Sequence, residues 1–256
     1  MIWGSCSATT YATCHLDDGI EVVALGLDVT PDAFQASAAL LSGAERDRAS
    51  RFAFDPDRRR FIVARAGLRT LLAARLGVTA EAVELTYGSN GKPALAQEQA
   101  ESGLQFNVSH SAEVAAYAFS FGQAIGIDVE NIRDVANADN IAARFFSARE
   151  NESYHALDPI DKPLGFLTCW TRKEAFIKAL GDGLTYSLRD FDVSLLPNEP
   201  AQILRVGDIP GAECGWTLRA ISPASGFVGA CVVRTTAVRA GSTATYSMAT
   251  SSMAQS

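Results

Sequence analysis

Hydrophobic and polar positions follow one another in blocks that predict a mixture of strands and helices. The opening segment 20–29 alternates well enough to be a strand. Thr30, which precedes a proline, marks a helix start because its hydroxyl can cap the first turn, and an apolar stripe carries the helix toward Gly43. A long helical pattern then runs over 44–76, with an interruption at Pro56 because proline removes a helical donor.

The remaining pattern predicts strands on either side of a group of helices. Strands are expected at 83–87, 104–108, 114–121 and 124–129, with a turn at 88–91. Helices are expected at 138–145, 148–157 and 162–180. Short strands are expected again at 191–195, 201–206, 215–220 and 227–233.

The order of these elements repeats coarsely on the two sides of residue 124. Helices and then strands come before it, and a strand, helices and further strands come after it. We therefore expect an α+β fold of two similar subdomains, 1–124 and 125–234, with the active site at their interface, because domain junctions are favoured places for ligands. The tail 235–256 is rich in Ser, Thr and Ala, and we expect it to be disordered.

Composition narrows the class of protein. With 256 residues, 48% of them hydrophobic, the chain can bury a sizeable core. The net charge of -7 argues against general affinity for nucleic acid or an anionic membrane, although arginines crowd the segment 46–75 and could frame an anion site. No stretch reaches the roughly 20 apolar residues of a membrane span. Five cysteines without a close pair suggest reduced thiols, and we expect a cytoplasmic protein.

Two carboxylates lie two residues apart in the strand expected at 124–129. Side chains at that spacing project to the same face, so Asp128 and Glu130 are close together. Like charges held so near repel one another unless a cation lies between them, and magnesium prefers such oxygen ligands. The alternative interpretation is a solvent-facing strand end.

The helix expected at 162–180 carries a second charged pair. Glu174 and Lys178 are one turn apart and share a face. They could form an ordinary surface ion pair. Alternatively, Glu174 completes a metal site and Lys178 offers its charge to a phosphate.

Short polar side chains follow the strand expected at 104–108. The hydroxyls and the imidazole of Ser109, His110 and Ser111 suit phosphate binding. A serine hydrolase is disfavoured, because the sequence lacks a GxSxG turn and adjacent strand residues point to opposite faces. The turn before Lys92 lets backbone approach a ligand.

Five segments in this order resemble the linear signature of the 4'-phosphopantetheinyl transferases, in particular the long single-chain type. They are GKPAL, FNVSHS, GIDVE, RFFSARE and WTRKEAFIKALGDGL. The resemblance spans roughly residues 41–191. It implies a pseudo-twofold pair of α/β subdomains with coenzyme A bound between them.

The resemblance also implies roles for individual residues. Asp128, Glu130 and Glu174 match the magnesium-binding acidic triad of the family. Positions that hold coenzyme A are matched by Lys92, Asn107, Ser109, His110 and Lys178. Arg48 corresponds to a basic residue for the 3'-phosphate of the nucleotide. Glu150 and Lys173 also occupy positions in the family motifs.

The implied reaction is attack of a carrier-protein serine on the β-phosphate of coenzyme A, which releases adenosine 3',5'-bisphosphate. Magnesium bridges the diphosphate, Lys178 adds charge, and Glu174 is the candidate base, directly or through water, with Glu150 in reserve. The partner is an apo acyl or peptidyl carrier protein, and the chain is expected to be a monomer. Two alternatives are a non-catalytic module that binds coenzyme A or a carrier protein, and a magnesium-dependent hydrolase of nucleotide diphosphates.

Overall fold

The strands form two main antiparallel sheets. The computed structural model describes residues 4–6, 11–16, 19–88, 91–181, 186–196 and 199–235. One sheet has the order β1-β2-β3-β7-β6 and consists of β1 (Gly4–Cys6), β2 (Tyr11–Leu16), β3 (Ile20–Gly26), β6 (Leu104–Ser111) and β7 (Val114–Phe121). The other has the order β11-β12-β8 and consists of β8 (Ile125–Asn131), β11 (Trp216–Ile221) and β12 (Phe227–Arg234). Two small hairpin sheets pair β4 (Leu85–Tyr87) with β5 (Pro93–Leu95), and β9 (Phe191–Val193) with β10 (Ile203–Val206).

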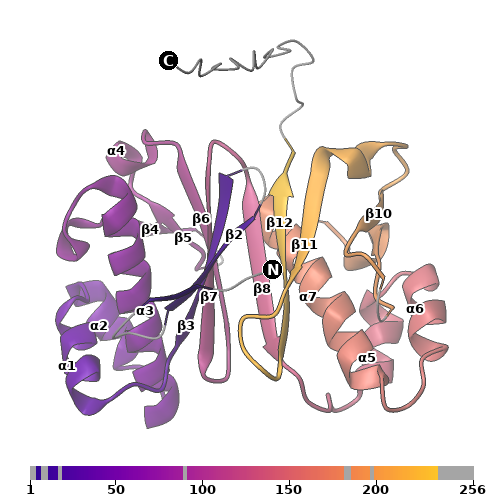
Figure 1. Ribbon diagram of the computed structural model, residues 1–256, viewed down its shortest axis with the longest axis horizontal. Coiled ribbons are helices and arrows are strands. Elements are labelled where there is room, and N and C mark those ends of the chain that lie inside the picture. Colours follow the sequence, from indigo (N-terminus) through magenta and orange to yellow (C-terminus); the bar gives the residue numbers. More distant parts are fainter. Residues whose placement is uncertain are drawn as a thin grey trace, which may run out of the picture.

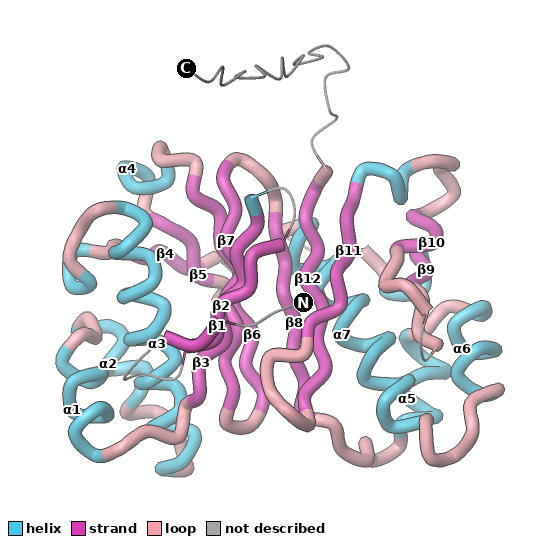
Figure 2. The backbone as a smooth tube through the Cα atoms, in the orientation of Figure 1, coloured by secondary structure: helices cyan, strands magenta, loops and turns pink. Residues whose placement is uncertain are grey.

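Helices cover the outer faces of both main sheets, and the fold is α+β, as predicted (Figures 1 and 2). Those before residue 124 are α1 (Pro31–Ala39), α2 (Gly43–Ala49), α3 (Asp55–Leu76) and α4 (Gln97–Ala100). Those after it are α5 (Ala138–Phe145), α6 (Ala148–His155) and α7 (Lys162–Leu180). In the described part of the chain, no helix has the length and apolar character that crossing a membrane requires.

Local signals explain where several helices begin. Thr30 caps α1, and Ser42 caps α2 in a reciprocal bond with Glu45. Pro56 stands in the first turn of α3, where a missing N–H costs nothing, so the proline starts this helix. The helices predicted at 138–145 and 162–180 are confirmed with the same bounds.

Other expectations about local structure were incomplete. β6 continues through Ser109–Ser111, which lie inside the strand and not after it. Strands β1, β2 and β5 and the short helix α4 were not predicted. The predicted tail from residue 236 onward and positions 89–90 of the predicted turn lie outside the described residues.

Three hydrophobic cores hold the layers together. The first joins the five-stranded sheet to α1–α3 and includes Val23 and Tyr117. The second joins the three-stranded sheet to α5–α7. The third contains residues of both sheets, among them Val22 and Ile127, and therefore lies between them. Figure 1 shows the resulting order, with α1–α3 on one outer side, α5–α7 on the other and the sheets between.

Strand β7 illustrates why its sequence is apolar at nearly every position. Ala116 and Ala118 belong to the core between the sheets, whereas Tyr117 and Phe119 belong to the core under α3. Because successive side chains point to opposite faces, a strand buried on both sides needs apolar residues throughout. Small residues on one face let the two sheets approach closely.

Helix α7 packs directly on the backbone of β8 at Gly126. A β-carbon there would lie 2.1 Å from the carbonyl oxygen of Ala175 and 2.4 Å from the amide nitrogen of Ala179. Only glycine permits this approach. It fixes α7 beside the strand that carries Asp128 and Glu130.

We predict that Gly126→Ala destabilises the protein by about 1–3 kcal/mol or more, because the added methyl meets backbone that cannot rotate away. Gly43→Ala is the control, since a β-carbon at this helix-start position meets nothing within 4 Å. Urea unfolding measures both. Equal stabilities of the two variants would contradict the tight contact between α7 and β8.

Candidate active site

The edge strands β6 and β8 face one another and are joined through side chains. Three alternate residues near the end of β6 accept hydrogen bonds from backbone N–H groups of β8. The bonds are Ile127 N to Asn107 Oδ1 at 3.0 Å, Val129 N to Ser109 Oγ at 3.3 Å and Asn131 N to Ser111 Oγ at 3.1 Å. We call these three bonds the β6–β8 side-chain ladder. It satisfies alternate N–H groups along an edge strand that would otherwise be left without partners.

The two serines of the ladder also orient the two acids of β8. Ser109 Oγ donates to Asp128 Oδ1 at 2.8 Å, and Ser111 Oγ donates to Glu130 Oε2 at 2.7 Å. A hydroxyl has a single proton, so each serine commits that proton to a carboxylate. Asn107 and Ser109 were predicted to hold coenzyme A. In the structure their side chains instead bond β8, Asn107 at the backbone and Ser109 at the backbone and at Asp128.

Asp128 is buried beside a lysine from α7. Lys178 Nζ donates to Asp128 Oδ1 at 2.7 Å and to the carbonyl of Ile127 at 3.1 Å. Burial raises the pKa of Asp128, and the positive charge of Lys178 only partly opposes this rise. Asp128 Oδ2 is buried and has no hydrogen-bond partner within the described residues, so one strong acceptor is left over.

Glu174 faces the same region from α7, as its spacing from Lys178 predicted. Its pKa is raised first by burial and then by the nearby negative charges of Asp128 and Glu130. It also lines a cavity of about 370 Å³ together with Arg144, Phe145, Ile177, Tyr186, Ser187, Leu188 and Arg189. The negative charge of Glu174 on α7 therefore repels those of Asp128 and Glu130 on β8.

This donor set fits a hard cation. The side chains offer oxygen ligands only, and Asp128 contributes a buried oxygen that nothing else uses. In the described ranges, no group of three or more His, Cys, Asp or Glu side chains is already drawn together as a metal site. Asp128, Glu130 and Glu174 are therefore electrostatic neighbours, and a cation would have to draw them closer.

A second cavity, of about 190 Å³, lies on the other face of β6. Its wall includes Val108 and His110, whose side chains alternate with those of the ladder. Gly91 and Pro93, the first residue of β5, also line it. Arg48 of α2 and Arg65 of α3 supply its positive charge. The expected basic residue Arg48 and the expected His110 thus line one cavity.

Arg65 lines the same cavity, and the sequence reasoning did not single it out. It is 9% exposed, and its Nη1 has no hydrogen-bond partner among the described residues. Its nearest acid is Glu45, with 3.7 Å between Arg65 Nε and Oε1, and the Glu45 carboxylate is already bonded to Arg69 at 2.7 Å. A buried guanidinium with an unused donor in a cavity wall is suited to an anionic ligand. The sequence showed only one arginine among many.

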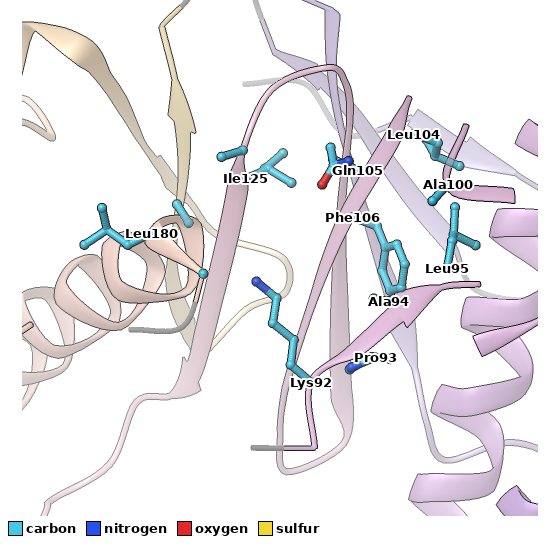
Figure 3. A pocket seen from close by; sticks show the side chains of 13 residues that line it. Lys92, Pro93, Ala94, Leu95, Ala100, Leu104, Gln105, Phe106, Ile125 and Leu180 are labelled. Carbon is cyan, nitrogen blue, oxygen red and sulfur yellow. The ribbon is translucent and has the colours of Figure 1, made fainter. Parts of the chain in front are cut away.

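The side chain of Lys92 reaches from the segment before β5 to helix α7. Its Nζ donates to the carbonyl oxygen of Lys178 at 2.8 Å, near the end of α7. Figure 3 shows the side chain extending toward Ile125 and away from Pro93, in a largely apolar cavity bounded on the α7 side by Leu180. The structure therefore brings Lys92 to the backbone of the residue whose side chain holds Asp128.

Comparison with known proteins identifies the family of this chain. The profile described as the N-terminal part of 4'-phosphopantetheinyl transferase matches residues 28–121, and that of the 4'-phosphopantetheinyl transferase superfamily matches residues 124–227. The 4'-phosphopantetheinyl transferase HetI of Nostoc sp. is 41% identical over 188 residues, which are 73% of this chain and 79% of that protein. The chain belongs to the 4'-phosphopantetheinyl transferase superfamily.

Phosphopantetheinyl transferases of other organisms are also similar to this chain. A 4'-phosphopantetheinyl transferase of Bacillus subtilis is 31% identical over 61% of this chain and 67% of its own length. The mouse protein named L-aminoadipate-semialdehyde dehydrogenase-phosphopantetheinyl transferase is 29% identical over 63% of this chain and 55% of its own length. The resemblance that the five motifs indicated is therefore confirmed.

Glu150 of this transferase lies away from the three acids. It is 1% exposed, caps α6 together with Ser147 and accepts a hydrogen bond from the Val193 amide at 2.7 Å. Its Oε2 lies 2.8 Å from the ammonium of Lys173, which is fully buried. Burial raises the pKa of Glu150, although the positive charge of Lys173 partly opposes this rise. In this position Glu150 holds α6, α7 and β9 together.

We predict that Lys173→Met lowers the free energy of unfolding by about 3–5 kcal/mol, because it leaves the Glu150 charge buried and unpaired. The double variant Glu150→Gln, Lys173→Met should regain part of this loss, since neither charge then remains. Urea unfolding measures both proteins. If Glu150→Gln alone abolished transfer at unchanged stability, a structural role for Glu150 would be excluded.

Proposed function

We propose that this transferase moves the 4'-phosphopantetheine group of coenzyme A to a serine of an apo acyl or peptidyl carrier protein, as a holo-[acyl-carrier-protein] synthase. The observation that carries the proposal is that Asp128, Glu130 and Glu174 are electrostatic neighbours, with Lys178 bonded to Asp128. Two arginines line a cavity on the other face of β6. The relatives named above as phosphopantetheinyl transferases support the same reaction.

Asp128, Glu130 and Glu174 would hold a magnesium ion. The unpartnered Asp128 Oδ2 and the mutual repulsion of the acids support this assignment. When bound, the ion supplies positive charge to the diphosphate of coenzyme A. Lys178 adds charge at the same place because its ammonium already lies against Asp128.

The arginine-lined cavity would hold the nucleotide end of coenzyme A. Arg48 and Arg65 present guanidinium groups there, and His110 lies in the same wall. Both guanidiniums lie over aromatic rings, at 5.4 Å for Arg48 and 5.7 Å for Arg65 from the Phe61 centroid. These contacts keep the donors oriented for the 3'-phosphate. Lys92, Asn107 and Ser109 would support the site through the backbone and acids they bond.

Glu174 is the proposed base for the serine hydroxyl. Glu174 borders the cavity of about 370 Å³, through which a carrier serine could reach it. Glu150, the reserve candidate, bonds to Lys173 and to backbone instead. Positioning supplies most of the acceleration because the protein forms no covalent bond itself.

The proposal includes a pseudo-twofold relation between subdomains 1–124 and 125–234. Each main sheet takes its strands from one side of residue 124, and each carries a long helix, α3 or α7, on its outer face. Such an arrangement supplies the site from a single chain, which supports a monomer. Among the residues whose side chains the structure describes, Cys14, Cys169, Cys214 and Cys231 are free thiols, which supports the expected cytoplasmic location.

We predict that an apo carrier protein gains the mass of one phosphopantetheine when it is incubated with this transferase, coenzyme A and magnesium, and that EDTA blocks the gain. Intact-protein mass spectrometry measures this. Asp128→Ala should abolish the gain while coenzyme A still binds, because the buried metal ligand is lost. Release of adenosine bisphosphate without a carrier would indicate a hydrolase instead.

We predict that Arg65→Met raises KM for coenzyme A about 10- to 100-fold, the effect of losing a charged hydrogen bond of about 1.5–3 kcal/mol. KM for 3'-dephospho-coenzyme A should stay nearly unchanged, because that substrate lacks the phosphate concerned. Arg60→Gln is the control, since Arg60 pairs with Asp28 at the surface. An equal rise in KM for both substrates would show that Arg65 does not bind the 3'-phosphate.

A further inference from the structure

Glu130 is held less firmly than its neighbouring acid. Asp128 is buried and has Lys178 as a counter-charge, whereas the Glu130 side chain is 25% exposed. Among the described residues, the Glu130 carboxylate is hydrogen-bonded by Ser111 and by Arg133. The position of Glu130 therefore depends on two donors that come from different directions.

The first donor is a serine with a fixed orientation. Ser111 Oγ accepts the N–H of Asn131 at 3.1 Å and donates to Glu130 Oε2 at 2.7 Å. Because the amide occupies a lone pair, the single proton of the hydroxyl is directed at the carboxylate. Ser111 thereby ties Glu130 to β6, on the side of Ser109 and Asp128.

The second donor is a surface arginine. Arg133 Nη1 lies 3.3 Å from the same Glu130 Oε2, and its side chain is 54% exposed. It also donates to the carbonyl of Asn131, the last residue of β8, at 3.2 Å. Ser111 and Arg133 thus bond the same oxygen of Glu130 at once, and neither bonds Oε1. If the Ser111 hydroxyl is lost, Arg133 is left as the donor that directs this carboxylate.

We propose that Ser111 is a positioning residue that keeps Glu130 in the active site against the attraction of Arg133. The proposal rests on the proposed metal-dependent function. Without the hydroxyl, the long Glu130 side chain turns toward Arg133 and away from Asp128. Partners that orient metal-binding carboxylates typically change metal affinity about 10- to 100-fold when they are removed.

Removal of Ser111 and removal of Arg133 should affect cation binding differently. Ser111→Ala weakens cation binding, whereas Arg133→Gln leaves it equal or slightly stronger because an exposed competing charge is gone. The double variant Ser111→Ala, Arg133→Gln recovers much of the loss. A role of Ser111 confined to capping the Asn131 amide would give no such recovery, because Arg133 has no part in that bond.

The test uses Mn²⁺ as a spectroscopic substitute for magnesium. Electron paramagnetic resonance titration of the full chain, saturated with coenzyme A and without a carrier protein, measures cation binding without turnover. We expect about tenfold weaker binding for Ser111→Ala and binding within about threefold of wild type for the double variant. Ser111→Thr keeps the hydroxyl and should bind like wild type.

Two results would overturn the proposal. Binding by Ser111→Ala within twofold of wild type would show that Glu130 needs no such support. A double variant as weak as Ser111→Ala would show that Arg133 does not compete. If the wild-type protein bound no Mn²⁺ at all, the proposed metal site would fail together with this inference, which separates that case from the first two.

Discussion

The active-site region depends on the hydrogen bonds by which side chains of β6 satisfy the backbone of β8. Two edge strands from different sheets meet there, and Asn107, Ser109 and Ser111 take the place of a strand's carbonyl groups. Buried N–H groups without partners are costly, so this contact fixes the register between the sheets. The same hydroxyls then fix the carboxylates of Asp128 and Glu130.

Helix α7 completes the site because it is held in two ways. Gly126 allows its backbone to touch β8, and Lys178 bonds both the strand and Asp128. Lys92 reaches the same turn from the other side of the molecule. The same contacts hold α7 on β8 and keep Glu174 near the acids of β8, because a shift of α7 would separate them.

Positive side chains gather at one cavity of a protein whose net charge is negative. The net charge is -7, yet the cavity beside β6 is lined by Arg48 and Arg65, and Lys178 stands among the acids. Glu45 neutralises only part of the arginine cluster, because its closest bond goes to Arg69. The fold thus concentrates positive charge at this cavity, although the net charge of the chain is negative.

The sequence by itself determined many of the local elements, and the family. The hydrophobic period predicted α5 and α7 with their bounds, and the ordered motifs identified the transferase family, because such signals act between residues close in the chain. Tertiary structure alone decided which partners the motif residues meet. Ser109 bonds Asp128, Glu150 bonds Lys173, and Arg65 keeps an unused donor, because these contacts join segments that spacing cannot relate.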